Sequence, residues 1–241
     1  MMLRFFYFIF FLYIPTLSFA ALFEQGFQAD YALSKNDFDI GVAEYRLYPQ
    51  PTGILIYEST AKPEGLAAMF IHDRIIERSH IVLNDNTLQP QKYEYQQKGG
   101  KETKNYQLNF NWTKKKLVNT NINQTFDLPS NTQDMLSFQL QLMKTLQSGG
   151  KELSFHLADR NKIRAYHLKY TGEMELETPI GKLKVIKLEH RRTDRNDVFR
   201  FWCAPGLEYL PVKIERVEDD GDRVLFELRH FASLPKATTE K

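Results

Sequence analysis

Apolar and polar residues alternate with a period of two along most of this chain. From Phe27 to Leu33 every second residue is apolar, and the same alternation recurs over 153–157. It recurs again over 212–216, where Arg216 falls in phase with the apolar positions. Such alternation is typical of strands that have one face on a core and the other in water, as in antiparallel sheets.

Short turn sequences separate the alternating runs. Asp220-Gly221 is the strongest hairpin signal, because both residues of a tight turn need positive φ. The stretches at 178–181 (TPIG) and 204–207 (APGL) predict turns in which proline fixes φ and glycine takes a positive φ. Pro211 cannot donate to a ladder, so its strand should lie at an edge or be bulged there. The predicted strands are 26–34, 39–48, 53–60, 74–83, 90–97, 102–111, 116–128 (continuous or broken), 152–158, 163–171, 173–178, 182–191, 198–203, 209–217 and 223–231.

One segment departs from this pattern. Its apolar residues recur at intervals of three and four, as Met135, Phe138, Leu142 and Leu146. This spacing predicts an amphipathic helix over about 132–148. Ser130 or Asn131 would cap its start, and Gly149-Gly150 would end it. A shorter helical turn is expected over 63–70.

These elements favour a mainly β fold. About a dozen antiparallel strands cannot remain one flat sheet, and an apolar helix needs a surface to cover. We therefore expect a strongly curved antiparallel sheet or partly open β-barrel, with one central helix over about 132–148 packed on it. No linker rich in proline, serine or glycine divides the chain, so 21–231 is predicted to be one domain and 232–241 a disordered tail.

The first twenty residues have the layout of a secretory signal peptide. Arg4 precedes an apolar run over 5–14, Pro15 breaks that run, and 18–20 read Ser-Phe-Ala, as before a cleavage site. The apolar run is too short to cross a bilayer, which needs roughly 20 residues. The expected location is the periplasm, with full secretion as the alternative, and no transmembrane span is expected after cleavage.

Composition removes several classes of protein. With 32 basic and 30 acidic side chains, the net charge of +2 argues against a strongly basic nucleic-acid-binding protein. A single cysteine, Cys203, excludes an intrachain disulfide, an iron–sulfur cluster and a cysteine-rich zinc site. Cys203 follows an apolar strand, so we expect it to pack as a small hydrophobic residue.

Three ordered stretches of the second half carry a family resemblance. They are Leu-Pro at 128–129 leading to QDMLS at 133–137, GE leading to ETPIG over 172–181, and FWCAPGLEYLPVKI at 201–214. In order and spacing they resemble the bacterial exported proteins of the domain-of-unknown-function family 3108. The resemblance implies an envelope protein with a signal peptide and a β-rich fold similar to curved barrels that handle hydrophobic cargo. It supplies no catalytic residue set and no cofactor.

Histidine and serine offer the main candidate chemistry. If the turn at 159–162 closes a hairpin, Ser154 lies opposite His167, with His156 diagonal to it; Glu152 would complete a nucleophile set. These residues alternate with apolar neighbours, so a solvated strand face is the favoured interpretation. A metal pair at His156 and His167 would need a third ligand. We therefore predict no catalytic residue, no metal site and no cofactor.

Aromatic and basic residues point to a different kind of site. A cavity lined by large apolar side chains with a few polar groups suits an acyl chain, and a packed aromatic core is the alternative. The basic runs at 114–116 and 190–195 are either solvated hairpin ends or contacts for anionic lipid headgroups. The candidate cavity residues are Tyr31, Tyr45, Phe138, Leu142, Trp202 and Tyr209.

Three functions remain open on this evidence. The first is a non-enzymatic periplasmic protein that binds a lipid or another apolar envelope component beneath the helix. The second is a structural or assembly factor that contacts another envelope protein through an edge strand or an exposed patch. The third is a hydrolase acting on envelope polymers, which would need convergent carboxylates or a Ser/His pair in a cleft.

Overall fold

A computed structural model describes residues 19–84, 87–100, 103–150, 153–192, 194 and 196–235. The predicted signal peptide lies outside these residues except at its end, where Phe19–Gln25 forms helix α1. Strand β16 runs to Ser233, two residues into the predicted tail, whose residues from 236 onward are outside the described part. Within the described part, no helix is long and apolar enough to span a bilayer.

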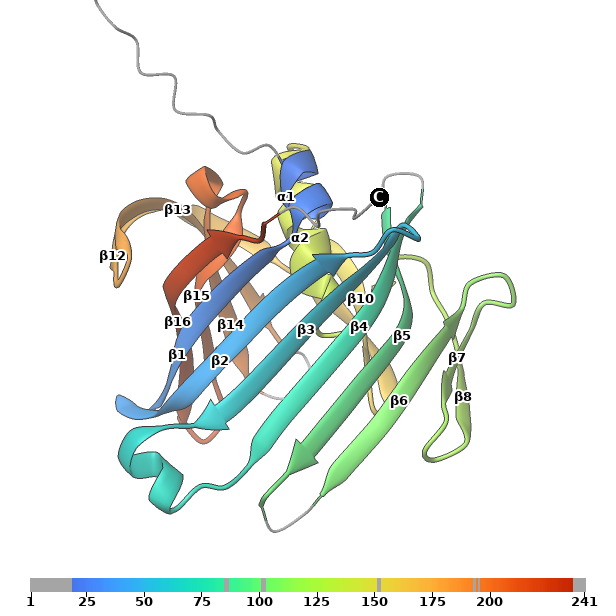
Figure 1. Ribbon diagram of the computed structural model, residues 1–241, viewed down its shortest axis with the longest axis horizontal. Coiled ribbons are helices and arrows are strands. Elements are labelled where there is room, and N and C mark those ends of the chain that lie inside the picture. Colours follow the sequence, from blue (N-terminus) through green and yellow to red (C-terminus); the bar gives the residue numbers. More distant parts are fainter. Residues whose placement is uncertain are drawn as a thin grey trace, which may run out of the picture.

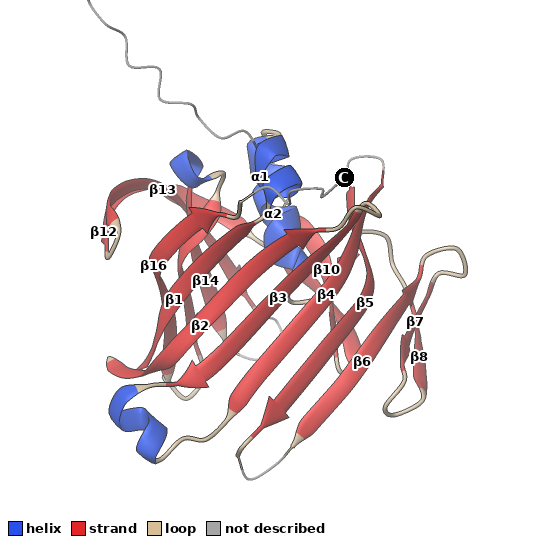
Figure 2. Ribbon diagram, in the orientation of Figure 1, coloured by secondary structure: helices blue, strands red, loops and turns tan. Residues whose placement is uncertain are grey.

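Most of the chain forms one antiparallel sheet of 13 strands (Figures 1 and 2). Its first eight strands are β1 (Phe27–Lys35), β2 (Phe38–Pro49), β3 (Ile54–Pro63), β4 (Arg74–Asn84), β5 (Thr87–Lys98), β6 (Lys104–Asn111), β7 (Lys116–Asn119) and β8 (Gln124–Asp127). The other five are β12 (Lys169–Thr178), β13 (Gly181–Arg191), β14 (Val198–Ala204), β15 (Leu210–Val217) and β16 (Arg223–Ser233).

The sheet consists of two meanders, β1–β8 and β12–β16, which are joined by the pairing of the first strand with the last. The strands follow β12-β13-β14-β15-β16-β1-β2-β3-β4-β5-β6-β7-β8, so β1 pairs with β16 at the centre while β12 and β8 form the two edges. The two edges do not pair with each other, and the strongly curved sheet remains open. The predicted architecture is therefore confirmed.

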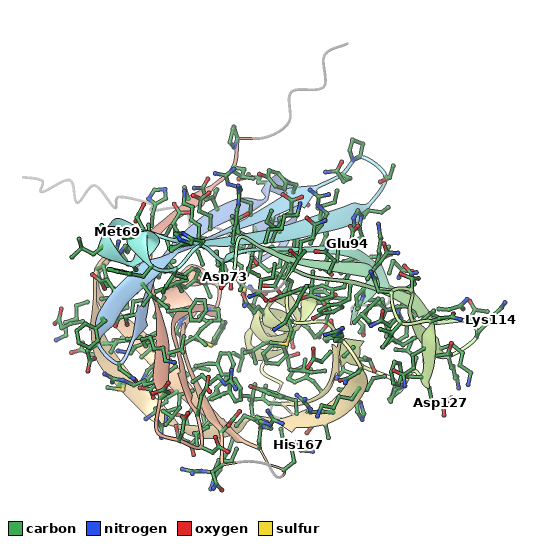
Figure 3. All side chains as sticks on the ribbon, turned by 90° about the horizontal axis from the view of Figure 1, so that it is seen from below. Met69, Asp73, Glu94, Lys114, Asp127 and His167 are labelled. Carbon is green, nitrogen blue, oxygen red and sulfur yellow. The ribbon has the colours of Figure 1, made fainter. Side chains whose placement is uncertain are left out.

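The connection between the two meanders fills the interior of this curved sheet. It contains α2 (Ser137–Gln147) and a small sheet of β9 (Thr132–Gln133), β10 (Ser154–Asp159) and β11 (Lys162–His167). From below, the strands form an open ring with the helix visible at its centre (Figure 3). Seven of the eleven residues of α2 are buried, including the polar Ser137 and Gln141. The helix is thus surrounded by the sheets rather than laid on an outer face.

The start of the helix differs from the prediction. Residues 132–133 form β9 and pair in parallel with β10, so the helix begins at Ser137 rather than at 132. Its N-terminal amides are capped by Asp134, whose Oδ1 accepts hydrogen bonds of 2.9 Å and 2.8 Å from the backbone N–H groups of Leu136 and Ser137. Ser130 and Asn131 are not the cap, because both lie before β9.

Two predicted turn features have different outcomes. Pro211 lies at a bulge, where the β14–β15 register shifts between Trp202 and Cys203, as predicted. At 204–207, however, the chain forms the short 3-10 helix η2 (Pro205–Leu207), and the positive φ angles fall on Glu208 and Tyr209 instead of Gly206. Proline is compatible with the first turn of a helix, which explains this arrangement. The segment predicted as a helical turn over 63–70 forms η1 (Gly65–Met69).

Candidate functional site

A cavity of about 780 Å³ lies beneath the start of α2. One wall comes from β13–β16, another from the β10–β11 hairpin, and Tyr45 and Glu77 line it from β2 and β4. Most of its lining residues on β14–β16 lie toward the strand ends near the β15–β16 turn. This is the same end of the curved sheet at which η1 lies (Figure 1). A cavity of this size is in the range of small-molecule sites.

Part of the cavity wall is apolar and incompletely covered. Phe199, Ile214, Val224 and Phe226 line it, and each is only partly buried. Deeper along the same strands the inward-facing Cys203, Val212 and Leu228 are fully packed. The alternation of inward-facing apolar residues therefore continues beyond the packed core. At this end of the curved sheet, the inward-facing side of the strands borders the cavity.

An aromatic cluster closes the cavity below α2. The ring of Phe138, from the first turn of the helix, packs edge-on to Phe155, Tyr166 and Phe201, with centroid distances of 5.1–5.9 Å. Tyr166 also stacks on His190 at 3.7 Å. Burial lowers the pKa of His190, and its Nδ1 lies 2.9 Å from the carbonyl oxygen of His167. These contacts fix the position of the helix above the cavity.

A polar group faces the cavity from β4. Glu77 accepts hydrogen bonds from the hydroxyl groups of Tyr93 and Ser59, the latter at 3.0 Å. Burial raises the pKa of Glu77 despite these two hydrogen bonds. Close by, Gln139 of α2 accepts a 3.3 Å hydrogen bond from the hydroxyl of Tyr57. The cavity thus has a small polar region opposite its apolar wall.

The six predicted cavity residues separate into two groups. Tyr45 and Phe138 line the cavity. Tyr31, Leu142, Trp202 and Tyr209 do not line it. Tyr31 is buried, and its hydroxyl donates a 2.8 Å hydrogen bond to the carbonyl oxygen of Pro211. Leu142 packs in the core under the helix, and the ring of Trp202 lies near the ammonium groups of Lys187 and Lys213.

The basic side chains of the cavity were not predicted as lining residues. Lys162, Arg164, Arg191, Arg192 and Arg216 all line it. The sequence contained a signal for one of them, because Arg216 is in phase with the inward-facing Val212 and Ile214. Of the two basic runs, 190–192 borders this cavity, whereas Lys116 of the other run forms a 2.6 Å ion pair with Asp127.

The Ser/His arrangement forms as the hairpin register predicts. Ser154 pairs with His167, and Ser154 Oγ lies 2.9 Å from His167 Nδ1. This contact is exposed, and no carboxylate of the described residues contacts His167; Glu152 lies outside the described part. His156 Nδ1 lies 3.1 Å from the carbonyl oxygen of Ser130. Over the described ranges, no group of three or more His, Cys, Asp and Glu side chains is placed to hold a metal.

Cys203 does not line the cavity. It is a fully buried free thiol on β14, in the core beneath the helix. Burial raises the pKa of the thiol well above its ordinary value. It packs as a small hydrophobic residue, as predicted.

Comparison with known proteins supports the fold. A family model described as "Protein of unknown function (DUF3108)" matches residues 27–228. No curated protein matches the chain by sequence. Among solved structures, a β-barrel-like protein of domain of unknown function DUF1849 from Brucella abortus has a TM-score of 0.59 at 10% identity, covering 87% of this chain and 98% of that one. This similarity concerns the fold alone.

Two other solved structures are similar at lower scores. One is the MucA/MucB complex of Pseudomonas aeruginosa, with a TM-score of 0.36 and 11% identity over 91% of this chain and 56% of that one. The other is a putative exported protein with a YmcC-like fold from Bacteroides fragilis, with a TM-score of 0.37 and 11% identity over 87% and 96% of the two chains.

Proposed function

This chain belongs to the family described as "Protein of unknown function (DUF3108)". From the cavity itself we propose that the protein is a non-enzymatic, exported protein that binds a lipid or another apolar component of the cell envelope. The carrying observation is the partly covered apolar wall of Phe199, Ile214, Val224 and Phe226 around about 780 Å³ of space. Apolar surface that stays in contact with water costs roughly 25 cal/mol per Å², so an apolar occupant of this space is favourable.

Two further observations support this proposal. The layout of residues 1–20 is typical of a secretory signal peptide, which would direct the chain to the periplasm, where apolar envelope components need shielding from water during transit. The helix α2 is held above the cavity by aromatic contacts through Phe138, so the space beneath it is preformed. A preformed cavity avoids the ordering cost of assembling a site upon binding.

Native mass spectrometry tests this proposal. The mature protein is purified from its own host without detergent, and the mass of the intact chain is compared before and after organic extraction. We expect an adduct that extraction removes and that lipid analysis identifies as an apolar envelope component. A chain that carries only its polypeptide mass, and that takes up no added monoacylglycerol after purification, would refute the proposal.

A second candidate function is contact with another envelope protein. Five large apolar side chains at and near η1 are exposed to solvent. They are Leu66 (81%), Met69 (68%), Phe70 (82%), Ile71 (38%) and, on β2, Phe38 (76%). Met69 is labelled at the rim of the ring in Figure 3. Exposed apolar side chains gathered in one place are typical of interaction surfaces. This patch favours a structural or assembly role, which photo-crosslinking from position 70 in intact cells would test.

A further inference from the structure

The cations at the cavity occupy the ends of strands that are apolar further in. On β15 Arg216 follows the inward-facing Ile214, and on β11 Arg164 precedes the buried Tyr166 by two residues. On the β13 side, Arg192 follows the buried His190 with the same spacing. Three different elements therefore place a guanidinium group where the apolar lining ends.

These guanidinium groups differ in how far they are neutralised. Arg192 pairs with both oxygens of Asp194, at 2.9 Å and 2.7 Å, and with Asp197 at 3.3 Å. Arg216 pairs with Asp197 at 3.0 Å and with Glu218 at 3.3 Å. Among the residues that the structure describes, Arg164 has one ion pair, a long contact of 3.7 Å to Asp159. In the described part of the chain, the buried Nε atoms of Arg164 and Arg216 have no hydrogen-bond partner.

Among the lining residues themselves, positive charges outnumber negative ones, although Glu189, Asp197 and Glu218 outside the lining pair with Arg191, Arg192 and Arg216. Arg164 is therefore the arginine of the lining with the weakest ion pair. The five cations of the lining are Lys162, Arg164, Arg191, Arg192 and Arg216, against the three carboxylates Glu77, Asp159 and Asp194. The hydrogen bonds from Arg192 lower the pKa of Asp194 to about 2, and the charge of Arg164 contributes less to the same shift. Burial raises the pKa of Glu77, which favours the neutral form of this carboxyl group.

We propose that the ligand of this cavity is an amphiphile with an anionic headgroup, a phosphate or a carboxylate, which Arg164 receives at the end of the apolar wall. The inference rests on the proposed function, because it assigns the headgroup of the molecule whose chain fills the cavity. Guanidinium groups bind phosphate and carboxylate through paired, charge-assisted hydrogen bonds. The ligand chain contacts Phe199, Ile214 and Phe226, and its headgroup accepts hydrogen bonds from the accessible part of the Arg164 guanidinium, whose side chain is 33% exposed.

Titration calorimetry on the delipidated full chain tests this assignment. The probes are dodecyl phosphate, the uncharged monoacylglycerol monolaurin, and inorganic phosphate. We expect dodecyl phosphate to bind about tenfold or more tightly than monolaurin, which corresponds to one charge-assisted contact. Inorganic phosphate should bind far more weakly, because it has no chain to bury.

Variants separate the headgroup contact from the apolar one. Arg164→Gln should weaken dodecyl phosphate binding about tenfold and leave monolaurin binding unchanged, and Arg164→Lys should retain part of the preference. The matched control is Arg229→Gln, an exposed arginine on β16 outside the cavity lining. Retained monolaurin binding reports that each variant is folded.

The outcomes distinguish the two levels of the proposal. If both amphiphiles bind equally and Arg164→Gln changes neither, the anionic headgroup is refuted while apolar binding stands. If inorganic phosphate binds as tightly as dodecyl phosphate, the cations form a simple anion site and the inference is also refuted. If neither amphiphile binds, the proposed function itself fails.

Discussion

Ser79 on β4 donates a 2.6 Å hydrogen bond through its hydroxyl to Oδ2 of Asp134, and both residues are fully buried. The other oxygen of Asp134 caps the first amides of α2. This single carboxyl group therefore connects the start of the central helix to the wall of the curved sheet.

Removal of this carboxyl group should destabilise the fold. Asp134→Ala loses the helix cap and leaves the buried hydroxyl of Ser79 without its acceptor, so we expect a loss of about 2–4 kcal/mol in the free energy of unfolding. Urea denaturation followed by circular dichroism measures it. The control is Asp219→Ala in the exposed β15–β16 turn, which should stay within about 0.5 kcal/mol of the wild type. Equal stability of the two variants would contradict the linking role of Asp134.

The same carboxyl group should make stability depend on pH. Burial raises the pKa of Asp134 from 3.8 to about 6. Because the folded state holds this proton more tightly than the unfolded state, the group stabilises the fold most at low pH. That contribution, on the order of 3 kcal/mol, is lost as pH rises from about 4 to about 6.

Asp134→Asn isolates this contribution, because the amide does not titrate. The difference in unfolding free energy between wild type and Asp134→Asn, measured from pH 4 to pH 7, should change in favour of the variant as pH rises. A difference that is constant over this range would show that the folded-state pKa of Asp134 is not raised.

Filling the cavity should exclude its ligand without harming the fold. Val224 lines the cavity and is partly exposed, so Val224→Phe places a ring in open space and should leave the melting temperature unchanged or slightly higher. The adduct seen by native mass spectrometry should decrease strongly. Val217→Phe is the matched control, since Val217 is a partly buried valine of β15 that does not line the cavity. An adduct of the same abundance in both variants would place the ligand elsewhere.

The Ser154–His167 pair should not act as a nucleophile. The pair is exposed, and in the described structure no carboxylate orients His167 for general-base catalysis. We expect a fluorophosphonate probe to leave the purified chain unlabelled. Labelling that disappears in Ser154→Ala and His167→Gln, but persists in Ser79→Ala, would instead support the hydrolase hypothesis.

The exposed patch at η1 should matter for association and not for stability. Phe70 is 82% exposed and Met69 is 68% exposed, so Met69→Ser combined with Phe70→Ser should leave the melting temperature unchanged. A photo-crosslinking residue at position 70 should capture one envelope protein in intact cells if the patch is a docking surface, and the capture should be lost with Met69→Ser. Crosslinks to lipid alone would contradict the assembly role.

The strands could be predicted because the alternation that marks them is local. The run from Phe27 to Leu33 is buried at every second position, as its pattern indicates. The start of α2 could not be predicted in the same way. Thr132 and Gln133 pair with β10, and Asp134, which caps the helix, accepts a hydrogen bond from Ser79 of β4. The boundary therefore involves residues far away in the sequence.

The site was predictable only in part for a similar reason. An aromatic residue in phase with a core has the same pattern whether it is packed, as Tyr31 is, or lines a cavity, as Tyr45 does. Curvature of the sheet decides between them, and curvature is set by all thirteen strands together. Arg216 was the informative exception, because a charged residue in phase with apolar neighbours indicates that the inward face meets water or a ligand there.

The pairing of β1 with β16 has a consequence for how this chain folds. The ladder joins Phe27 to Ser233, so the interior of the sheet is complete only when two strands far apart in the sequence have met. Each meander can form through adjacent hairpins, but one edge of β1 stays unpaired until β16, the last strand of the sheet in the sequence, has formed. Such late, distant closure slows folding and exposes a strand to aggregation in the meantime. A circular permutant with its native termini joined, and with new ends at the turn between β5 and β6, would form this ladder as a local hairpin and should refold faster.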